Sequence, residues 1–176
     1  MLSQVTASSA PGATSTEVLP VEQYVATLNR KRMAAGVLFR DALGQVLLVE
    51  PSYKKNWEIP GGAVEADESP WRTAERELRE EIGWAGRLGR LLVVDYVRPQ
   101  DGRPEGVVFV FDGGVLTETD VSRMVLNPIE IISAGFYSLA EVAKLVKPLL
   151  ADRLSAALEA TREDVTVLCE QGRRIA

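Results

Sequence analysis

The sequence predicts an α/β fold with one domain. Short apolar runs rich in Val and Leu alternate with turn residues, which is typical of strands. Near the middle of the chain lies a helical pattern with recognisable start and stop residues, and a second helical pattern follows near the C-terminus. A chain of 176 residues, 46% of them apolar, can bury a core of ordinary size without disulfides or structural metals.

The N-terminal part of the chain differs in composition from the rest. Residues 1–20 are rich in Ser, Thr, Ala, Pro and Gly and lack a periodic apolar pattern, so they predict a flexible tail. We expect residues 21–176 to form a single domain that ends with a C-terminal helix. Within it, residues 21–32 are a transition in which a short helix or an edge strand is expected.

A β-hairpin is expected first in the compact part of the chain. The apolar runs at 33–40 and 45–50 flank a turn-like Asp-Ala-Leu-Gly segment at 41–44. The segment Trp-Glu-Ile-Pro-Gly-Gly at 57–62 then predicts a short extended piece that ends in a glycine loop.

The next element is the best-defined helix of the sequence, expected over 70–82. Ser69 is a good N-cap, Pro70 suits the first helical position, and Gly83 suits the position after the last turn. Its apolar stripe predicts that Trp71 and Leu78 belong to the core.

The second half of the chain predicts further strands and helices. Strands are expected at 90–97 and 107–114, separated by a loop with Pro and Gly. An irregular loop is expected over 117–132, followed by a strand at 134–139 that enters a helix whose Ser138 and Glu141 have capping-box spacing. Helical periodicity covers 148–162, and the residues after it predict an edge strand or a frayed end.

Composition excludes several kinds of active site. The chain has no histidine and one cysteine, Cys169, which excludes Ser-His-Asp triads, Cys-His dyads, HExxH zinc sites and structural zinc. If the protein is an enzyme, its acid–base groups are Asp, Glu, Lys or Tyr, and any metal is a hard cation bound by oxygen.

Charge and hydropathy restrict the partners and the location. A net charge of −5 disfavours a general nucleic-acid binder. No apolar run approaches the ~20 residues of a membrane-spanning helix, and no secretory signal is recognised. The single cysteine favours a cytoplasmic location.

Three glutamates on the central helix suggest chemistry. Glu77, Glu80 and Glu81 have i, i+3 and i+4 spacing, so they lie close together and repel one another. Two of them are in the last turn, where the helix dipole disfavours negative charge. A divalent cation would reverse both penalties, and Arg76 could orient the cluster. The alternative is a solvated acidic face interleaved with arginines.

The segment from Gly62 to Trp84 resembles the Nudix box, Gx5Ex7REUxEExGU, where U is a bulky apolar residue. Nine positions are in register, and Trp in place of an aliphatic residue at the last one is slightly unusual. The matching residues are Gly62, Glu68, Arg76, Glu77, Leu78, Glu80, Glu81, Gly83 and Trp84.

This resemblance implies a fold and an activity. The fold would be an α/β/α sandwich with a mixed central sheet and the box helix packed on it. The activity would be Mg²⁺- or Mn²⁺-dependent hydrolysis of a nucleoside diphosphate linked to another moiety X, with water attacking phosphorus. The partner would thus be a small nucleotide substrate. Members of the family often form homodimers, and the sequence leaves the oligomeric state open.

The resemblance also implies roles for the residues of the box. Glu77, Glu80 and Glu81 would bind the metal, and in some members one of them, such as Glu77 here, acts instead as the base. Glu68 would support the metal through water or orient the loop, and Arg76 would hold Glu77. Gly62, or its neighbour, would offer a backbone carbonyl to the metal.

Outside the box, the candidates are weaker. Family members often take a further acidic residue from a late loop, for which Glu130 is the best candidate, ahead of Glu105 and Asp112. Arg98 and Lys54 are candidates for phosphate binding, and Tyr53 for stacking on a base.

Substrate identity is the most open question. Pro99, fifteen residues after the box, slightly favours ADP-ribose or another nucleotide sugar. The alternatives are a MutT-like (d)NTP pyrophosphohydrolase and a catalytically silent module that binds a nucleotide.

Overall fold

The computed structural model describes residues 19–176, which divide into two compact units at Arg30. The first unit contains one short helix, α1 (Val21–Thr27), in the segment where a short helix or an edge strand is expected. The predicted flexible tail lies outside the described residues except for its last two. The second unit, Lys31–Ala176, contains all the other elements.

A mixed sheet forms the centre of the second unit. Its strand order is β6-β2-β1-β5-β4-β7-β8, with β3 paired to β1 beside this path. The pairs β1–β5 and β4–β7 are parallel and the others are antiparallel. The strands are β1 (Arg32–Arg40), β2 (Val46–Pro51), β3 (Gly61–Ala63), β4 (Leu91–Val97), β5 (Gly106–Val115), β6 (Ile131–Tyr137), β7 (Val167–Glu170) and β8 (Arg173–Arg174).

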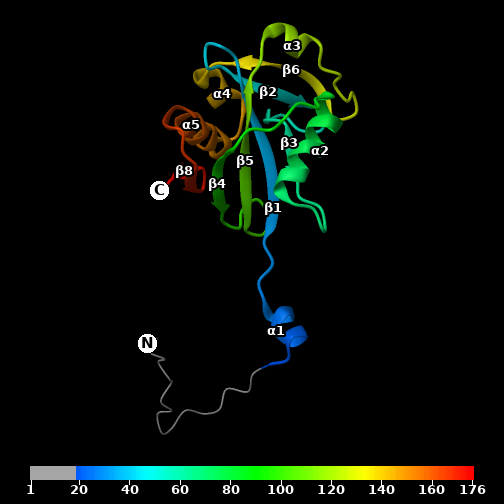
Figure 1. Ribbon diagram of the computed structural model, residues 1–176, viewed down its shortest axis with the longest axis vertical. Coiled ribbons are helices and arrows are strands. Elements are labelled where there is room, and N and C mark those ends of the chain that lie inside the picture. Colours follow the sequence, from blue (N-terminus) through cyan, green and yellow to red (C-terminus); the bar gives the residue numbers. More distant parts are fainter. Residues whose placement is uncertain (1–18) are drawn as a thin grey trace, which may run out of the picture. The chain divides into compact units, whose positions relative to one another are not determined.

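Helices cover both faces of this sheet (Figure 1). Helix α2 (Pro70–Ile82) contacts β1, β3 and β5, whereas α4 (Leu139–Leu145) and α5 (Pro148–Glu163) contact strands such as β2, β4 and β7 from the opposite side. The unit is therefore an α/β/α sandwich with a mixed sheet, which confirms the predicted fold class.

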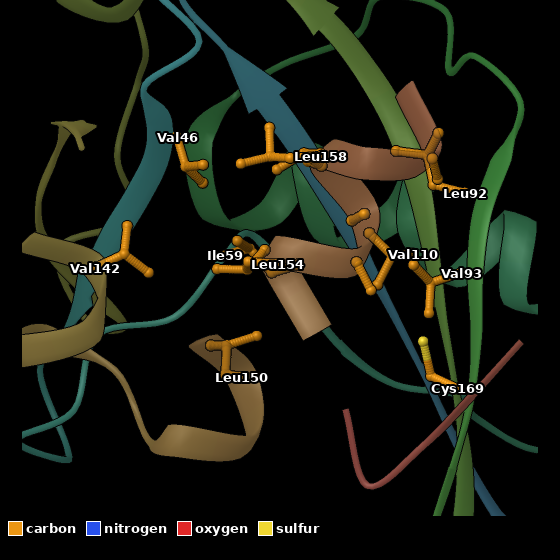
Figure 2. Close-up of a cluster of buried hydrophobic side chains, with 14 of the residues drawn as sticks. Val46, Ile59, Leu92, Val93, Val110, Val142, Leu150, Leu154, Leu158 and Cys169 are labelled. Carbon is orange, nitrogen blue, oxygen red and sulfur yellow. The ribbon is translucent and has the colours of Figure 1, made fainter. Parts of the chain in front are cut away.

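Side-chain alternation along the strands explains the two layers. Successive residues of a strand point to opposite faces, so Leu38 of β1 enters one cluster of buried side chains while Val37 and Phe39 enter the other. Figure 2 shows the first cluster, in which Leu154 and Leu158 of α5 lie against the sheet. The second cluster contains the apolar stripe of α2 and holds that helix on the sheet.

Several predicted elements are confirmed at residue level. Strands β1 and β2 pair antiparallel across the predicted turn. Helix α2 has the predicted bounds, because the Ser69 hydroxyl accepts a hydrogen bond from the Arg72 N–H and Gly83 ends the helix with φ 65°. The predicted capping box of α4 is present at Ser138 and Glu141.

Two expectations are wrong. The segment 117–132 is not wholly irregular, because Thr117 and Asp120 form a capping box that starts the short helix α3 (Glu118–Ser122). Trp71 is not a core residue: it is 38% exposed, at the first turn of α2, and its ring meets Phe111 in an edge-to-face arrangement. Within residues 19–176, no helix is both long enough and apolar enough to cross a bilayer.

Candidate active site

Helix α2 presents its three glutamates to different environments. Leu78 and Ile82 are fully buried against the sheet. Glu81, beside Ile82, is consequently only 6% exposed, whereas Glu77 is half-buried and Glu80 is exposed. The amphipathic pattern of the helix thus carries one carboxylate into the protein and leaves another in solvent.

Strand β3 brings two glycines against these carboxylates. The Gly61 N–H donates a hydrogen bond to Glu81 Oε2 at 2.8 Å. Gly61 has a φ of 143°, and a Cβ there would lie 2.2 Å from the carbonyl oxygen of Ala35. A Cβ on Gly62 would lie 2.2 Å from Glu77 Oε1. The close backbone of β1 thus requires glycine at position 61, and the close carboxylate of Glu77 favours glycine at position 62.

The Arg76 guanidinium connects the remaining acidic residues of the segment. It donates to both carboxylate oxygens of Glu68 at 2.9–3.0 Å, to Glu77 at 2.9 Å and to Glu80 at 3.0 Å. The hydrogen bonds from Arg76 and then from the Thr73 hydroxyl lower the pKa of Glu68 to about 2. Arg76 is therefore a positioning residue, as its spacing to Glu77 and Glu80 suggests.

Burial and mutual repulsion raise the pKa values of the two carboxylates nearest the glycines. For Glu81, burial is the largest cause and raises the pKa to about 8, against the opposing hydrogen bond from Gly61; the charges of Glu77 and Glu130 raise it further. Burial also raises the pKa of Glu77, although Arg76 opposes it. The positive charges nearby, Arg76 for Glu77 and Lys54 for Glu81, are too weak to cancel the effect of burial.

Glu130 belongs to the same cluster although it is far away in sequence. Its charge raises the pKa of both Glu77 and Glu81. Asn127, in the same loop, donates its N–H to the carbonyl of Glu81 at 2.9 Å, which joins the loop to the end of α2. The two weaker acidic candidates have other partners, since Glu105 binds Lys31 and Tyr96, and Asp112 binds Arg40.

A cleft of about 830 Å³ opens beside this cluster. Gly61, Gly62 and Glu81 line it, together with two of the predicted substrate-binding residues, Tyr53 and Lys54. The third, Arg98, is not among the lining residues: it bonds Glu170 of β7 with 2.5 and 2.8 Å contacts.

The structure adds cleft residues that sequence reasoning missed. They are basic and come from β1, the β4–β5 turn, the α4–α5 junction and α5: Arg32, Arg103, Lys147 and Arg153. No local motif surrounds them, because only the packing of distant elements brings them together. The Asp101-Gly102 pair is the one local signal, since it predicts a tight turn that presents Arg103.

The donor atoms of the site suit a hard cation, because they are carboxylate and carbonyl oxygens. As the side chains lie, however, no group of three or more acidic or Cys side chains within residues 19–176 forms a ready metal cage. In this arrangement Arg76 binds the carboxylates of Glu68, Glu77 and Glu80. The carboxylate and carbonyl oxygens of the site fit a divalent cation, which would share the carboxylates with Arg76.

The chain is similar to known proteins in sequence and in fold. The NUDIX domain model matches residues 30–158. Diphosphoinositol polyphosphate phosphohydrolase 3-alpha of Mus musculus is 44% identical over 82 residues, which are 46% of this chain and 49% of the mouse protein. The match thus spans about half the length of such curated relatives.

Solved structures show the same fold at lower identity. The MutT protein of Methanosarcina mazei Go1 has a TM-score of 0.60 at 23% identity, covering 78% of this chain and 99% of that protein. An ADP-ribose pyrophosphatase of Streptococcus suis has a TM-score of 0.58 at 21% identity, covering 80% and 99%. The family model covers most of the chain, including helix α2 and strand β3. The chain therefore belongs to the Nudix family.

Proposed function

We propose that the protein hydrolyses a pyrophosphate bond in a nucleoside diphosphate derivative, by attack of water at phosphorus, with Mg²⁺ or Mn²⁺ as cofactor. One observation carries this proposal: Glu77 and Glu81 meet the glycines of β3 at the edge of a cleft with room for a nucleotide. Nudix hydrolases generally need a divalent metal, and the donor atoms here suit one.

Five residues would hold the cation. The carboxylates of Glu77, Glu80 and Glu81 and the carbonyl of Gly62 would be ligands, with Glu68 in support. A bound divalent cation would stabilise the negative charge that develops on the phosphoryl oxygens.

The other residues of the site would position the reacting groups. Arg76 would keep Glu77 and Glu80 oriented through the bonds it already makes. The glycines Gly61 and Gly62 would let phosphate oxygens approach the backbone without a side chain between them. Glu77 and Glu130 are the two candidates for the base that accepts the proton of the attacking water.

The pyrophosphate would extend into the cleft past Tyr53 and Lys54. Tyr53 is 70% exposed and could stack on a base, and Lys54 lies over its ring at 5.3 Å while it bonds Glu58 at 2.8 Å. Binding of a phosphate would compete with Glu58 for this lysine. A substrate-binding role for Arg98 stays a prediction, as do a cytoplasmic location and a homodimer.

ADP-ribose or another nucleotide sugar is the substrate that we favour, in agreement with the name of the Streptococcus suis neighbour. The mouse relative is named for diphosphoinositol polyphosphates, and the Methanosarcina neighbour is named MutT. A substrate panel therefore decides among ADP-ribose, other nucleotide sugars, canonical and oxidised dNTPs, dinucleoside polyphosphates and diphosphoinositol polyphosphates. Release of AMP and ribose phosphate would establish the favoured substrate, and a silent binding module would turn over none of them.

Glu81→Gln tests the mechanism. We expect turnover to fall at least ~100-fold, because the variant loses a buried metal ligand while it keeps the shape of the side chain. Glu75→Gln is the matched control: Glu75 lies on the same helix, bonds Arg72 and does not line the cleft. Magnesium-dependent turnover at the wild-type rate in Glu81→Gln, with the melting temperature unchanged, would refute the proposed role of the cluster.

A further inference from the structure

Two arginines in the cleft form no ion pair with any carboxylate of residues 19–176. Arg32 begins β1 and Arg103 lies in the turn between β4 and β5, and both line the cleft that Glu81 also lines. Among the described residues, neither is ion-paired with a carboxylate. The other basic residues of the cleft are paired: Lys54 with Glu58, Lys147 with Asp101, and Arg153 with Asp95.

The backbone holds both arginines in place. Arg32 Nε donates to the carbonyl of Pro104 at 2.9 Å, and its side chain passes over Gly106, where a Cβ would lie 2.6 Å from Arg32 Cγ. Arg103 follows the turn residues Asp101 and Gly102, whose φ values are 52° and 72°. Two positive φ values in a two-residue turn are typical of the type I′ hairpin.

The ends of this turn are closed by backbone hydrogen bonds. Gln100 and Arg103 exchange N–H···O bonds of 3.1 and 2.9 Å, and Lys147 bonds Asp101 from the start of α5. The position from which Arg103 reaches the cleft is therefore preorganised before any ligand arrives.

Like charges meet at this end of the cleft. Burial lowers the pKa of Arg32, and the charges of Arg103 and Arg153 lower it further. Asp95 neutralises Arg153, and Asp101, whose charge also acts on Arg103, is already ion-paired with Lys147; within residues 19–176, neither Arg32 nor Arg103 forms an ion pair of its own. An anion between them would remove the repulsion, and phosphate is the anion whose geometry the guanidinium fork matches.

We propose that Arg32 and Arg103 bind a phosphate monoester of the substrate that is separate from the pyrophosphate that is cleaved. This inference rests on the proposed function, because it assigns the two parts of the cleft to two parts of one substrate. The carboxylate part receives the pyrophosphate together with the cation, and the arginine part receives the additional phosphate. The substrate class is thus a nucleoside diphosphate derivative that carries a further phosphate monoester, so ADP-ribose would be a substrate but a poorer one than its 2′-phosphate.

The first experiment measures binding without catalysis. Inositol hexakisphosphate carries phosphate monoesters and no pyrophosphate bond, so it probes phosphate binding in the cleft without cleavage, and the arginine variants show what Arg32 and Arg103 contribute. Calorimetry in the presence of a chelator should show binding that weakens at least 10-fold in Arg32→Lys and in Arg103→Ala. Arg87→Ala is the matched control for Arg103→Ala, since both variants lose one positive charge and Arg87 is exposed outside the cleft.

The second experiment measures turnover of a matched substrate pair. ADP-ribose and its 2′-phosphate share the same pyrophosphate bond and differ by one phosphate monoester. We expect a higher kcat/KM for the phosphorylated compound in the wild type, and an equal kcat/KM for the two compounds in Arg103→Ala. The difference should lie mainly in KM, because the arginines bind the substrate at a distance from the reacting atoms.

The two experiments separate this inference from the proposed function. Arginine-dependent binding of inositol hexakisphosphate without hydrolysis of any substrate would support the phosphate site and refute the proposed function. Binding that is unchanged in Arg103→Ala and Arg32→Lys, or that falls equally in Arg87→Ala, would overturn the phosphate site. A far-UV spectrum and a melting curve for each variant show that a loss of binding is not a loss of folding.

Discussion

Removal of one partner of the buried Asp95–Arg153 ion pair should destabilise the protein strongly. Asp95 on β4 is 0% exposed, and Arg153 on α5 approaches it to 2.6 Å. The Gly172 N–H donates to both oxygens of the same carboxylate, at 3.0 and 3.1 Å. The pair thus connects the sheet, a helix and the turn before the last strand.

The magnitude follows from what remains after Arg153→Met. Asp95 would keep only the Gly172 N–H as a donor, in a position without access to water. An uncompensated buried charge costs about 3–5 kcal/mol, so we expect the free energy of unfolding to fall by about that amount. The double variant Asp95→Asn/Arg153→Met removes both charges and keeps an acceptor for Gly172, so it should recover at least ~2 kcal/mol of the loss.

Urea denaturation monitored by circular dichroism measures these differences. Arg173→Ala is the matched control, because the Arg173–Asp152 pair at 3.2 Å is exposed and should contribute less than about 1 kcal/mol. A loss below ~1 kcal/mol in Arg153→Met, or a double variant no more stable than the single one, would refute the reasoning.

Three further predictions concern the site and the core. Gly61→Ala should lower the free energy of unfolding by about 2 kcal/mol or more, because the new Cβ would meet backbone atoms at a positive φ. Gly62→Ala should lower kcat at least ~10-fold with little change in melting temperature, because the new Cβ would meet the movable carboxylate of Glu77. The reverse pattern in urea denaturation and in kinetics would contradict this reasoning. A chelator should abolish hydrolysis and added Mg²⁺ or Mn²⁺ should restore it in a steady-state assay, and hydrolysis that persists in the chelator would count against the cofactor. Burial raises the pKa of Cys169 to about 11, so this thiol should resist alkylation at pH 8 in the folded protein and react in urea. The free energy of unfolding should fall as the pH rises from about 9 to about 11, because only the unfolded chain then releases the thiol proton. Rapid alkylation of the native protein, detected by mass spectrometry, would disprove the prediction.

Local signals made parts of the fold predictable. The bounds of α2 follow from Ser69, Pro70 and Gly83, whose effects on the backbone depend on neighbours within a few residues. A similar signal was present but weaker at Thr117 and Asp120, where Asp replaces the usual Glu of the capping box and starts α3.

Long-range features were beyond the reach of the pattern. The parallel pairing of β7 with β4 depends on how α5 crosses the sheet, and periodicity carries no information on strand order. Trp71 shares the apolar stripe of α2, but it lies at the start of the helix and its ring stays partly in solvent, which periodicity alone does not show.

The residues of the candidate site also fall into those that local sequence predicts and those that only the folded chain brings together. The box residues follow from one stretch of sequence, and the structure brings Glu68, Arg76 and Glu77 into direct contact. Arg32 and Arg103 could not be found, because they come from a strand start and a hairpin turn about 70 residues apart and meet only through the β1–β5 pairing.

The contacts of Asp95 also constrain when the protein can finish folding during its synthesis. Strand β4 leaves the ribosome well before its partners Arg153 and Gly172, which lie 58 and 77 residues later in the chain. A nascent chain that ends before Arg153 therefore carries an unpaired carboxylate that favours water over the core. We expect α5 to close over the sheet only after Arg153 has been translated, so arrested chains shorter than this should remain accessible to proteases on that face.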